Sequence, residues 1–183
     1  MKEQTNSEPK FKTKTSTTAE PALYELFLDC LRDIYWAENH LVKTLPKMSQ
    51  AASSKQLVGA IEQHLAETVG HVSRIEQIFG LLEQKTIAKK CDAMEGLTKE
   101  GEGVIEGTDA GTATRDVGII LSSQKVEHYE IASYLGLIQL ATTLGLEEVA
   151  DILAQTLAEE QASDELLASI AENDIAYQAS QEA

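Results

Sequence analysis

The 183-residue chain contains little proline and little positive charge. Only three residues are proline, while Ala, Leu, Glu and Gln are plentiful, and this composition favours helix. Lys and Arg together number 15 against 30 Asp and Glu, which gives a formal net charge of −15. Because no basic stripe offsets this charge, the sequence argues against a nucleic acid or an anionic membrane as partner.

Cysteine is rare, and long hydrophobic runs are missing. The two cysteines, Cys30 and Cys91, do not have the spacing of a metal-binding motif, and we expect both thiols to be free. No apolar run approaches the length of a membrane span, and residues 1–20 lack the apolar segment of a secretory signal. These observations predict a cytoplasmic protein.

Four segments show the apolar periodicity of long helices. We expect helices over about residues 21–48, 54–83, 114–144 and 146–171. Gly145 suits the left-handed residue that ends the third helix. Because no segment alternates apolar and polar residues with a period of two, the sequence predicts no sheet.

The lengths of the connections indicate how these helices are arranged. Short links after the first and third helices favour two antiparallel pairs. Residues 84–113 are long enough to run back along a helix, and Ile87, Cys91, Met94 and Leu97 lie there at helical spacing. The prediction is an all-α, ferritin-like four-helix bundle whose long crossover between helices 2 and 3 carries a short extra helix. We expect the domain over 21–172, a disordered tail over 1–20 and a C-terminal tail over 173–183.

Acidic residues interrupt the inward, apolar face of every predicted long helix near its middle. Residues three or four apart share one helix face. By this criterion six acids point inward: Glu38, Glu67, Glu127, Glu130, Glu160 and Asp164. Buried carboxylates without a partner are costly, whereas iron and manganese accept carboxylate and imidazole ligands, and bridging carboxylates can hold two such ions. The pattern therefore predicts a cation among the acids.

A solvated face is the alternative interpretation. With 30 acids in the chain, some fall on an apolar stripe by chance, and Glu130 or Asp164 could reach solvent from its edge. By spacing, His64 is better explained as a packed or outer-shell histidine than as a ligand. His128 and Glu159 are expected to point away from the site. Tyr35 and Tyr134 are expected in the core, where their hydroxyls could orient ligand carboxylates.

Five segments carry a family resemblance. In order, "LFLDCLRDIYWAENHLVKTLPKM", "HLAETVGHVSRIEQIF", "KKCDAMEGL", "VEHYEIASY" and "LAEEQASDELL" together resemble the bacterial YciE/YciF-type ferritin-like family over about residues 22–172. The resemblance implies a cytosolic four-helix domain, usually a homodimer, that is linked with stress responses. It does not bring an established reaction.

The wider relatives of that family are rubrerythrins and ferritins. Glu127 and Glu130 are similar to the Glu-x-x-Glu of the third rubrerythrin helix, Glu38 to the single acid of the first helix, and Glu67 and Glu160 to the bridging acids. The sequence departs from this pattern at two places. Gly70 stands where a histidine is expected and His71 follows it, and Ser163 stands before Asp164. With His71 added to the six acids, the resemblance implies a site for two iron ions or for manganese.

A di-metal centre of this kind could oxidise ferrous iron or consume peroxide. The rival hypothesis is a non-enzymatic stress protein that keeps the bundle as an interaction scaffold, with the site vacant or holding a structural ion. Storage of iron in a cage is not indicated, because nothing in the sequence specifies a multi-subunit shell.

Overall fold

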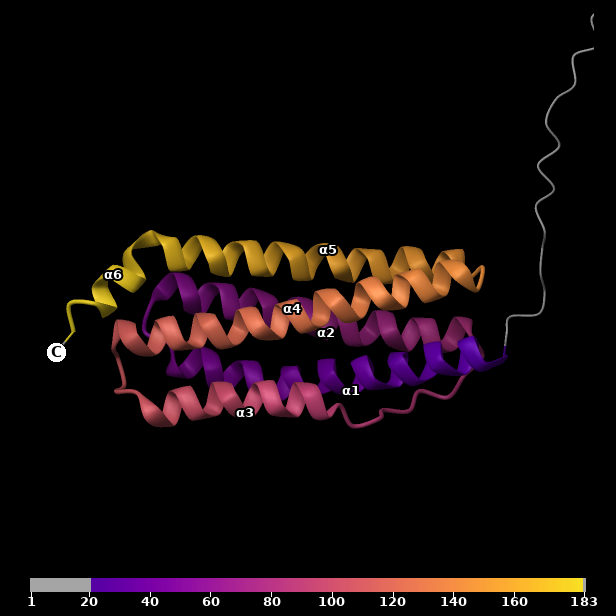
Figure 1. The fold of residues 1–183 in the computed structure, drawn as a ribbon, viewed down its shortest axis with the longest axis horizontal. Coiled ribbons are helices and arrows are strands. Elements are labelled where there is room, and N and C mark those ends of the chain that lie inside the picture. The colour runs from indigo at the N-terminus through magenta and orange to yellow at the C-terminus, as the bar shows by residue number, and fades with distance from the viewer. Residues whose placement is uncertain (1–20, 183) are drawn as a thin grey trace, which may run out of the picture.

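The computed structural model describes residues 21–182 and forms an elongated bundle of helices (Figure 1). The helices are α1 (Pro21–Ala51), α2 (Lys55–Leu81), α3 (Asp92–Gly107), α4 (Ala113–Thr143), α5 (Glu147–Ile170), a π-helix (Ala171–Ile175) and α6 (Ala176–Ala179). No strand occurs within 21–182, so the all-α fold class is confirmed. The predicted disordered tail, 1–20, lies outside the described residues. Among the helices of 21–182, none combines the length and the apolar character needed to cross a membrane.

Local sequence signals account for most helix ends. Ser54 caps α2, because its side chain accepts a hydrogen bond from the Leu57 N–H. Thr112 caps α4 in the same way through the Arg115 N–H. Gly145 ends the α4 turn with a φ of 73°, the left-handed conformation that the sequence predicted there. One end differs: α1 continues past Pro46 to Ala51, about one turn further than expected.

Four long helices, α1, α2, α4 and α5, share the long axis of the molecule in Figure 1. The α1–α2 pair and the α4–α5 pair are each closed by a short link and pack against one another through α1–α4 and α2–α5 contacts. In Figure 1, α2 and α4 run in the same direction, and the segment between them returns along α1 and holds α3. This helix packs against α1 and α4, so one side of the bundle has an additional cover.

The connecting segment before α3 is partly extended. The helical spacing of Ile87, Cys91, Met94 and Leu97 predicted helix from Ile87 onward, but Ile87 is half exposed and helix begins only at Asp92. Cys91 is the N-cap, and its sulfur accepts a hydrogen bond from the Met94 N–H at 3.3 Å. Both cysteines are free thiols, as predicted.

Helical structure continues into residues 173–182, the segment expected to be a C-terminal tail. The π-helix and α6 continue α5, and Ile175 is buried in the core. Residues five apart would lie about 140° apart on an α-helix, and the wider π turn brings Ile175 nearer to the face of Ile170. Glu182 then caps α4, since its carboxylate accepts hydrogen bonds from the Ala113 N–H at 2.7 Å and the Thr114 N–H at 2.9 Å.

A buried carboxylate ties the two helix pairs together at one end of the bundle. Asp116 in the first turn of α4 is 3% exposed. It accepts hydrogen bonds from the Ser53 N–H and the Ser54 N–H, both at 2.8 Å, and from the Ser53 hydroxyl at 2.7 Å. The link between α1 and α2 is therefore held by α4.

We expect Asp116→Ala to lower the free energy of unfolding by about 3 kcal/mol, because it removes three hydrogen bonds that a buried carboxylate accepts. Urea denaturation of both proteins at pH 7 measures the difference. Asp109→Ala, at an exposed position before the same helix, is the matched control and should change stability little. Equal stabilities of the two variants would show that the Asp116 contacts contribute nothing.

Candidate metal centre

Six ionisable side chains meet in the middle of the bundle. We call them the buried cluster: Glu38, His64, His71, Glu127, Glu130 and Glu160. The α1–α2 pair supplies the first three and the α4–α5 pair the other three. Glu38, His71, Glu130 and Glu160 are fully buried, and the remaining two are at most 4% exposed. The sequence left open whether Glu130 reaches solvent from the edge of the apolar face, and the structure shows that it does not.

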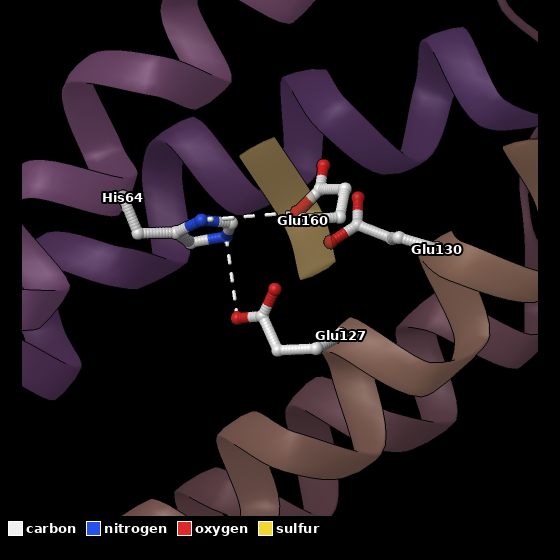
Figure 2. Close-up of side chains that lie close together, drawn as sticks. All are labelled: His64, Glu127, Glu130 and Glu160. Carbon is white, nitrogen blue, oxygen red and sulfur yellow. Dashed lines mark ion pairs between the residues drawn. The ribbon is translucent and has the colours of Figure 1, made fainter. Parts of the chain in front are cut away.

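The cluster consists of two groups that share one residue. In the first group, one potential ligand atom from each of His64, Glu127, Glu130 and Glu160 lies within 4.8 Å of all the others. Figure 2 shows these four side chains converging from α2, α4 and α5. The second group joins Glu160 to Glu38 and His71 within the same limit. Glu160 is therefore the residue that the two groups have in common.

The hydrogen-bonding capacity of these side chains is largely unused. Within residues 21–182, all but one of the buried side-chain nitrogen and oxygen atoms without a hydrogen-bond partner belong to the buried cluster. Both carboxylate oxygens of Glu130 and both of Glu160 are among them. Buried polar atoms without partners are costly, and carboxylate oxygens with imidazole nitrogens are donors that iron and manganese accept. The residues present thus fit a pair of divalent transition-metal ions.

The carboxyl groups are poised to hold protons when no cation is bound. Burial raises the pKa of Glu127 and of Glu130 well above the ordinary value, and the neighbouring Glu160 carboxylate raises both further. Burial also raises the pKa of Glu38, although His71 beside it acts in the opposite direction. A cation that binds here must therefore displace protons.

The two cluster histidines differ in charge. Burial lowers the pKa of His64, so the ring is neutral at pH 7, with nitrogens 3.6 Å from Glu127 Oε1 and 3.8 Å from Glu160 Oε2. Burial acts in the same direction on His71, but the adjacent carboxylates of Glu160 and Glu38 raise its pKa to about 10. His71 Nδ1 lies 3.0 Å from Glu160 Oε1 and 3.4 Å from Glu38 Oε2. In the metal-free protein at pH 7, the His71 ring is therefore protonated and places a positive charge beside the acids.

The structure brings together five of the seven residues that the sequence predicted as ligands. They are Glu38, His71, Glu127, Glu130 and Glu160. Glu67 remains outside, only half-buried, and accepts a hydrogen bond from the Gln63 side chain at 2.9 Å. Asp164 also remains outside, where it accepts from His128 Nε2 at 3.2 Å at the surface. His128 itself is exposed, as predicted.

His64 enters the cluster in place of Glu67, contrary to the packed or outer-shell role expected from its spacing. The reason is the rotation of α2. Its buried positions include His64, Thr68 and His71, four and then three residues apart, and this centres the inward face on Thr68. Glu67 lies about 100° from Thr68 on that helix. The seven-residue interval between the two histidines was the signal in the sequence, because residues seven apart lie only about 20° apart.

One core tyrosine contacts the cluster directly. Tyr134 is fully buried, and its hydroxyl donates a hydrogen bond to Glu38 Oε1. It thereby fixes one oxygen of that carboxylate, as the sequence suggested. Tyr35 instead lies half-buried at the edge of the core, where its hydroxyl donates to Glu76 Oε1 at 2.8 Å.

The sequence predicted that Glu159 points away from the site, but its carboxylate contacts a histidine of the buried cluster. Its Oε2 lies 2.9 Å from His71 Nε2, the ring nitrogen opposite the cluster. Arg74 holds the same carboxylate through two nitrogens, at 2.6 and 2.7 Å. A carboxylate on the outer nitrogen of a ligand histidine fixes its ring orientation and increases its basicity.

We expect Glu159→Ala to weaken metal binding about 10- to 100-fold without changing the number of ions bound at saturation, because the His71 ring loses its outer partner. Competition with a chelator of known affinity measures this change. Glu165→Ala, an exposed acid on the same helix, should leave the affinity unaltered. If the two variants bind metal equally well, Glu159 does not orient His71.

Comparisons with known proteins identify the family and the fold of the chain. Residues 22–180 match the family described as "Domain of unknown function (DUF892)". The protein YciF of Escherichia coli K12 is 42% identical over 152 residues, which cover 82% of this chain and 91% of YciF. The crystal structure of YciF, described there as a stress protein, matches with a TM-score of 0.80 over 84% of this chain and 96% of that chain.

Two further solved structures have the same fold. YcfI from Rhodopseudomonas palustris, which is described as a candidate structural protein, is 36% identical and has a TM-score of 0.77 over 86% of this chain and 97% of its own. A protein from Xanthomonas campestris is 24% identical, with a TM-score of 0.67 over 84% of this chain and 94% of its own, and it supports the fold alone.

Proposed function

The chain belongs to the DUF892 family, and from its buried cluster we propose that it binds two transition-metal ions, iron or manganese, and uses them to consume a small oxidant during stress. The observation that carries the proposal is the set of unpartnered carboxylate and imidazole atoms in two groups that share Glu160. Such a set is hard to explain in a bundle core without cations. The stress context comes from the E. coli relative, which is described as a stress protein.

The residues divide into two ligand sets. His64, Glu127 and Glu130 would hold one ion, Glu38 and His71 the other, and Glu160 would bridge them. A ferrous pair would supply the two electrons that break the O–O bond of hydrogen peroxide, each ion becoming ferric, while two protons from solvent complete two water molecules.

The protein's own side chains supply position and exclude water. Tyr134 fixes Glu38 through its hydroxyl, and Glu159 fixes His71 through the outer ring nitrogen. On α1, Glu38 lies between the apolar residues Ile34 and Leu41, and both of these are almost completely buried. Dry surroundings of this kind strengthen the attraction between the carboxylates and a cation.

An interaction scaffold is the second candidate. The description of the R. palustris relative as a candidate structural protein favours it, and in that case the cluster would hold a structural ion or protons. A homodimer and a cytoplasmic location remain predictions from the sequence.

Metal analysis and redox chemistry separate the two candidates. Protein purified without chelator, and protein loaded anaerobically with ferrous ion, should each contain two ions per chain. Hydrogen peroxide should then oxidise the bound iron with a stoichiometry of one peroxide per pair. Two bound ions that peroxide does not oxidise would favour the scaffold, and a loaded protein without bound iron would contradict the metal site itself.

A further inference from the structure

A small cavity reaches the buried cluster between α1, α3 and α4. Its volume is about 30 Å³. Glu127 is part of its wall, and the residues that line it also include Leu41, Leu45, Met48, Gly101 and Val126. A second, smaller cavity of about 10 Å³ has His64 in its wall and shares Leu45, Ser123 and Glu127 with the first. Glu127 is thus the cluster residue that both cavities share, and His64 lines the smaller one.

Three of the four hydroxyl groups in the wall of the larger cavity donate their hydrogens to backbone carbonyls, and the fourth is that of Ser123. Thr44 donates to the His40 carbonyl at 3.0 Å, Thr98 to the Met94 carbonyl at 2.9 Å, and Ser122 to the Gly118 carbonyl at 2.9 Å. Each of these three hydroxyl hydrogens is therefore used within its own helix. A charged species would lose its water here without sufficient replacement, which is costly.

The volume limits the size of a visitor. One water molecule needs about 10–15 Å³ of cavity measured in this way, so about 30 Å³ accommodates two such atoms. Hydrogen peroxide has two oxygen atoms and no charge, so it matches the volume, and Ser123 and Glu127 in the wall can hydrogen-bond to it. An organic hydroperoxide with several carbon atoms does not.

We propose that this cavity is the passage by which oxidant reaches the cluster, and that its width restricts the substrate class to small neutral molecules such as hydrogen peroxide. The inference rests on the proposed function and adds its substrate specificity. It also gives α3 a role, because this helix forms the outer wall of the passage opposite α1 and α4.

Gly101 and Met48 set the width of the passage. A Cβ atom at Gly101 would lie 3.1 Å from Met48 Cε and 3.7 Å from Ser122 Cβ. Gly101→Ala therefore places a methyl group between two wall residues, while the change itself favours helix. Gly96→Ala is the matched control, since it lies on the same helix and a Cβ there meets nothing within 4 Å. Ser122→Val narrows the passage from the opposite wall.

The first experiment compares oxidants by stopped flow, using protein loaded anaerobically with ferrous ion. Hydrogen peroxide should oxidise the ferrous ions bound to the wild type at least about tenfold faster than cumene hydroperoxide does. A tenfold difference in rate needs only a small difference in activation free energy. Gly101→Ala and Ser122→Val should slow the reaction with hydrogen peroxide, and Gly96→Ala should not. Bound iron is measured in every variant and should be equal.

The second experiment does not depend on activity. Crystals of the metal-free protein pressurised with xenon should show xenon beside Met48 and Val126 in the wild type and in Gly96→Ala, and none in Gly101→Ala. A wild type without xenon, or Gly101→Ala with as much xenon as the wild type, overturns the passage. Equal rates with both peroxides, or full iron content with an unchanged rate in both narrowed variants, also overturn it and leave the proposed function standing. Failure to bind iron in the wild type overturns both.

Discussion

Glu160→Gln should abolish binding of both metal ions, because Glu160 is the one residue common to the two groups of the buried cluster. The amide keeps the size of the side chain and removes its negative charge. The loss of affinity should exceed the about 10- to 100-fold that follows removal of an outer-shell partner. Metal analysis of chelator-stripped protein after reloading with ferrous or manganous ion gives the stoichiometry.

Two companion variants make this test specific to a bridging role. Glu38→Gln removes a residue of the second group only, so it should leave about half of the metal content. Glu165→Gln changes an exposed acid on the same helix as Glu160 and should retain all of it. Equal metal content in Glu160→Gln and Glu165→Gln would mean that the shared carboxylate is not a ligand.

The metal-free protein should become less stable as the pH rises from 7 to 9. Glu127 and Glu130 have pKa values well above the ordinary one in the folded protein, whereas their pKa values in the unfolded chain are about 4.3. Between those values the folded protein holds protons that the unfolded chain has released. The free energy of unfolding then falls by about 1.4 kcal/mol per pH unit for each such proton.

The two histidines also make the free energy of unfolding depend on pH, and their two effects have opposite signs in different pH ranges. His71 has a pKa of about 10 when folded and about 6.5 when unfolded, so its stabilisation is present below 6.5 and is lost as the pH rises through 10. The lowered pKa of His64 produces the opposite slope, but only below about 6.5. Measurements between pH 7 and 9 therefore report the downward slope.

Denaturant unfolding of chelator-stripped protein at several pH values measures this slope. Glu130→Gln removes one of the carboxyl groups whose pKa is raised in the folded protein, so the fall in stability with rising pH should become smaller. Glu62→Gln, at an exposed position on α2, should leave the slope as in the wild type. A wild-type stability that stays constant or rises between pH 7 and 9 would contradict the retention of protons by the buried cluster.

A bound metal ion should counteract this loss. Ferrous or manganous ion at about a hundred- to a thousandfold excess over its dissociation constant should stabilise the folded protein by about 3–4 kcal/mol. Magnesium should do less, since it requires near-ideal octahedral geometry and retains its water. The same unfolding measurements under anaerobic conditions, with each ion added at pH 8, compare them.

Periodicity was sufficient to predict the long helices and the acids at their centres. Glu38, Glu127, Glu130 and Glu160 interrupt apolar faces strongly enough for their inward direction to be read from spacing. Glu67 and His64 show where this reasoning fails. They lie about 60° apart on α2, and only the packing of Thr68 at full burial decides which one points inward.

Contacts between distant residues could not be predicted in this way. Glu159 was expected to take no part in the site, because it points outward on α5. The structure shows that this direction leads to Arg74 and His71 on α2. Residue spacing within one helix does not show which side chains of the adjacent helix lie opposite. Candidate ligands can therefore be predicted from the sequence, whereas the residues that hydrogen-bond to those ligands cannot.

The division of the buried cluster between the two helix pairs has a consequence for the order of folding. Each pair closes through a short link, so its contacts are local and form early. The contacts of the cluster join residues far apart in the chain: His71 and Glu159 are 88 positions apart, and Glu38 and Tyr134 are 96. We therefore expect the acids to stay hydrated until the two helix pairs dock. Their dehydration falls on that late step, and an ion that gathers ligands from both pairs would act as a template for it.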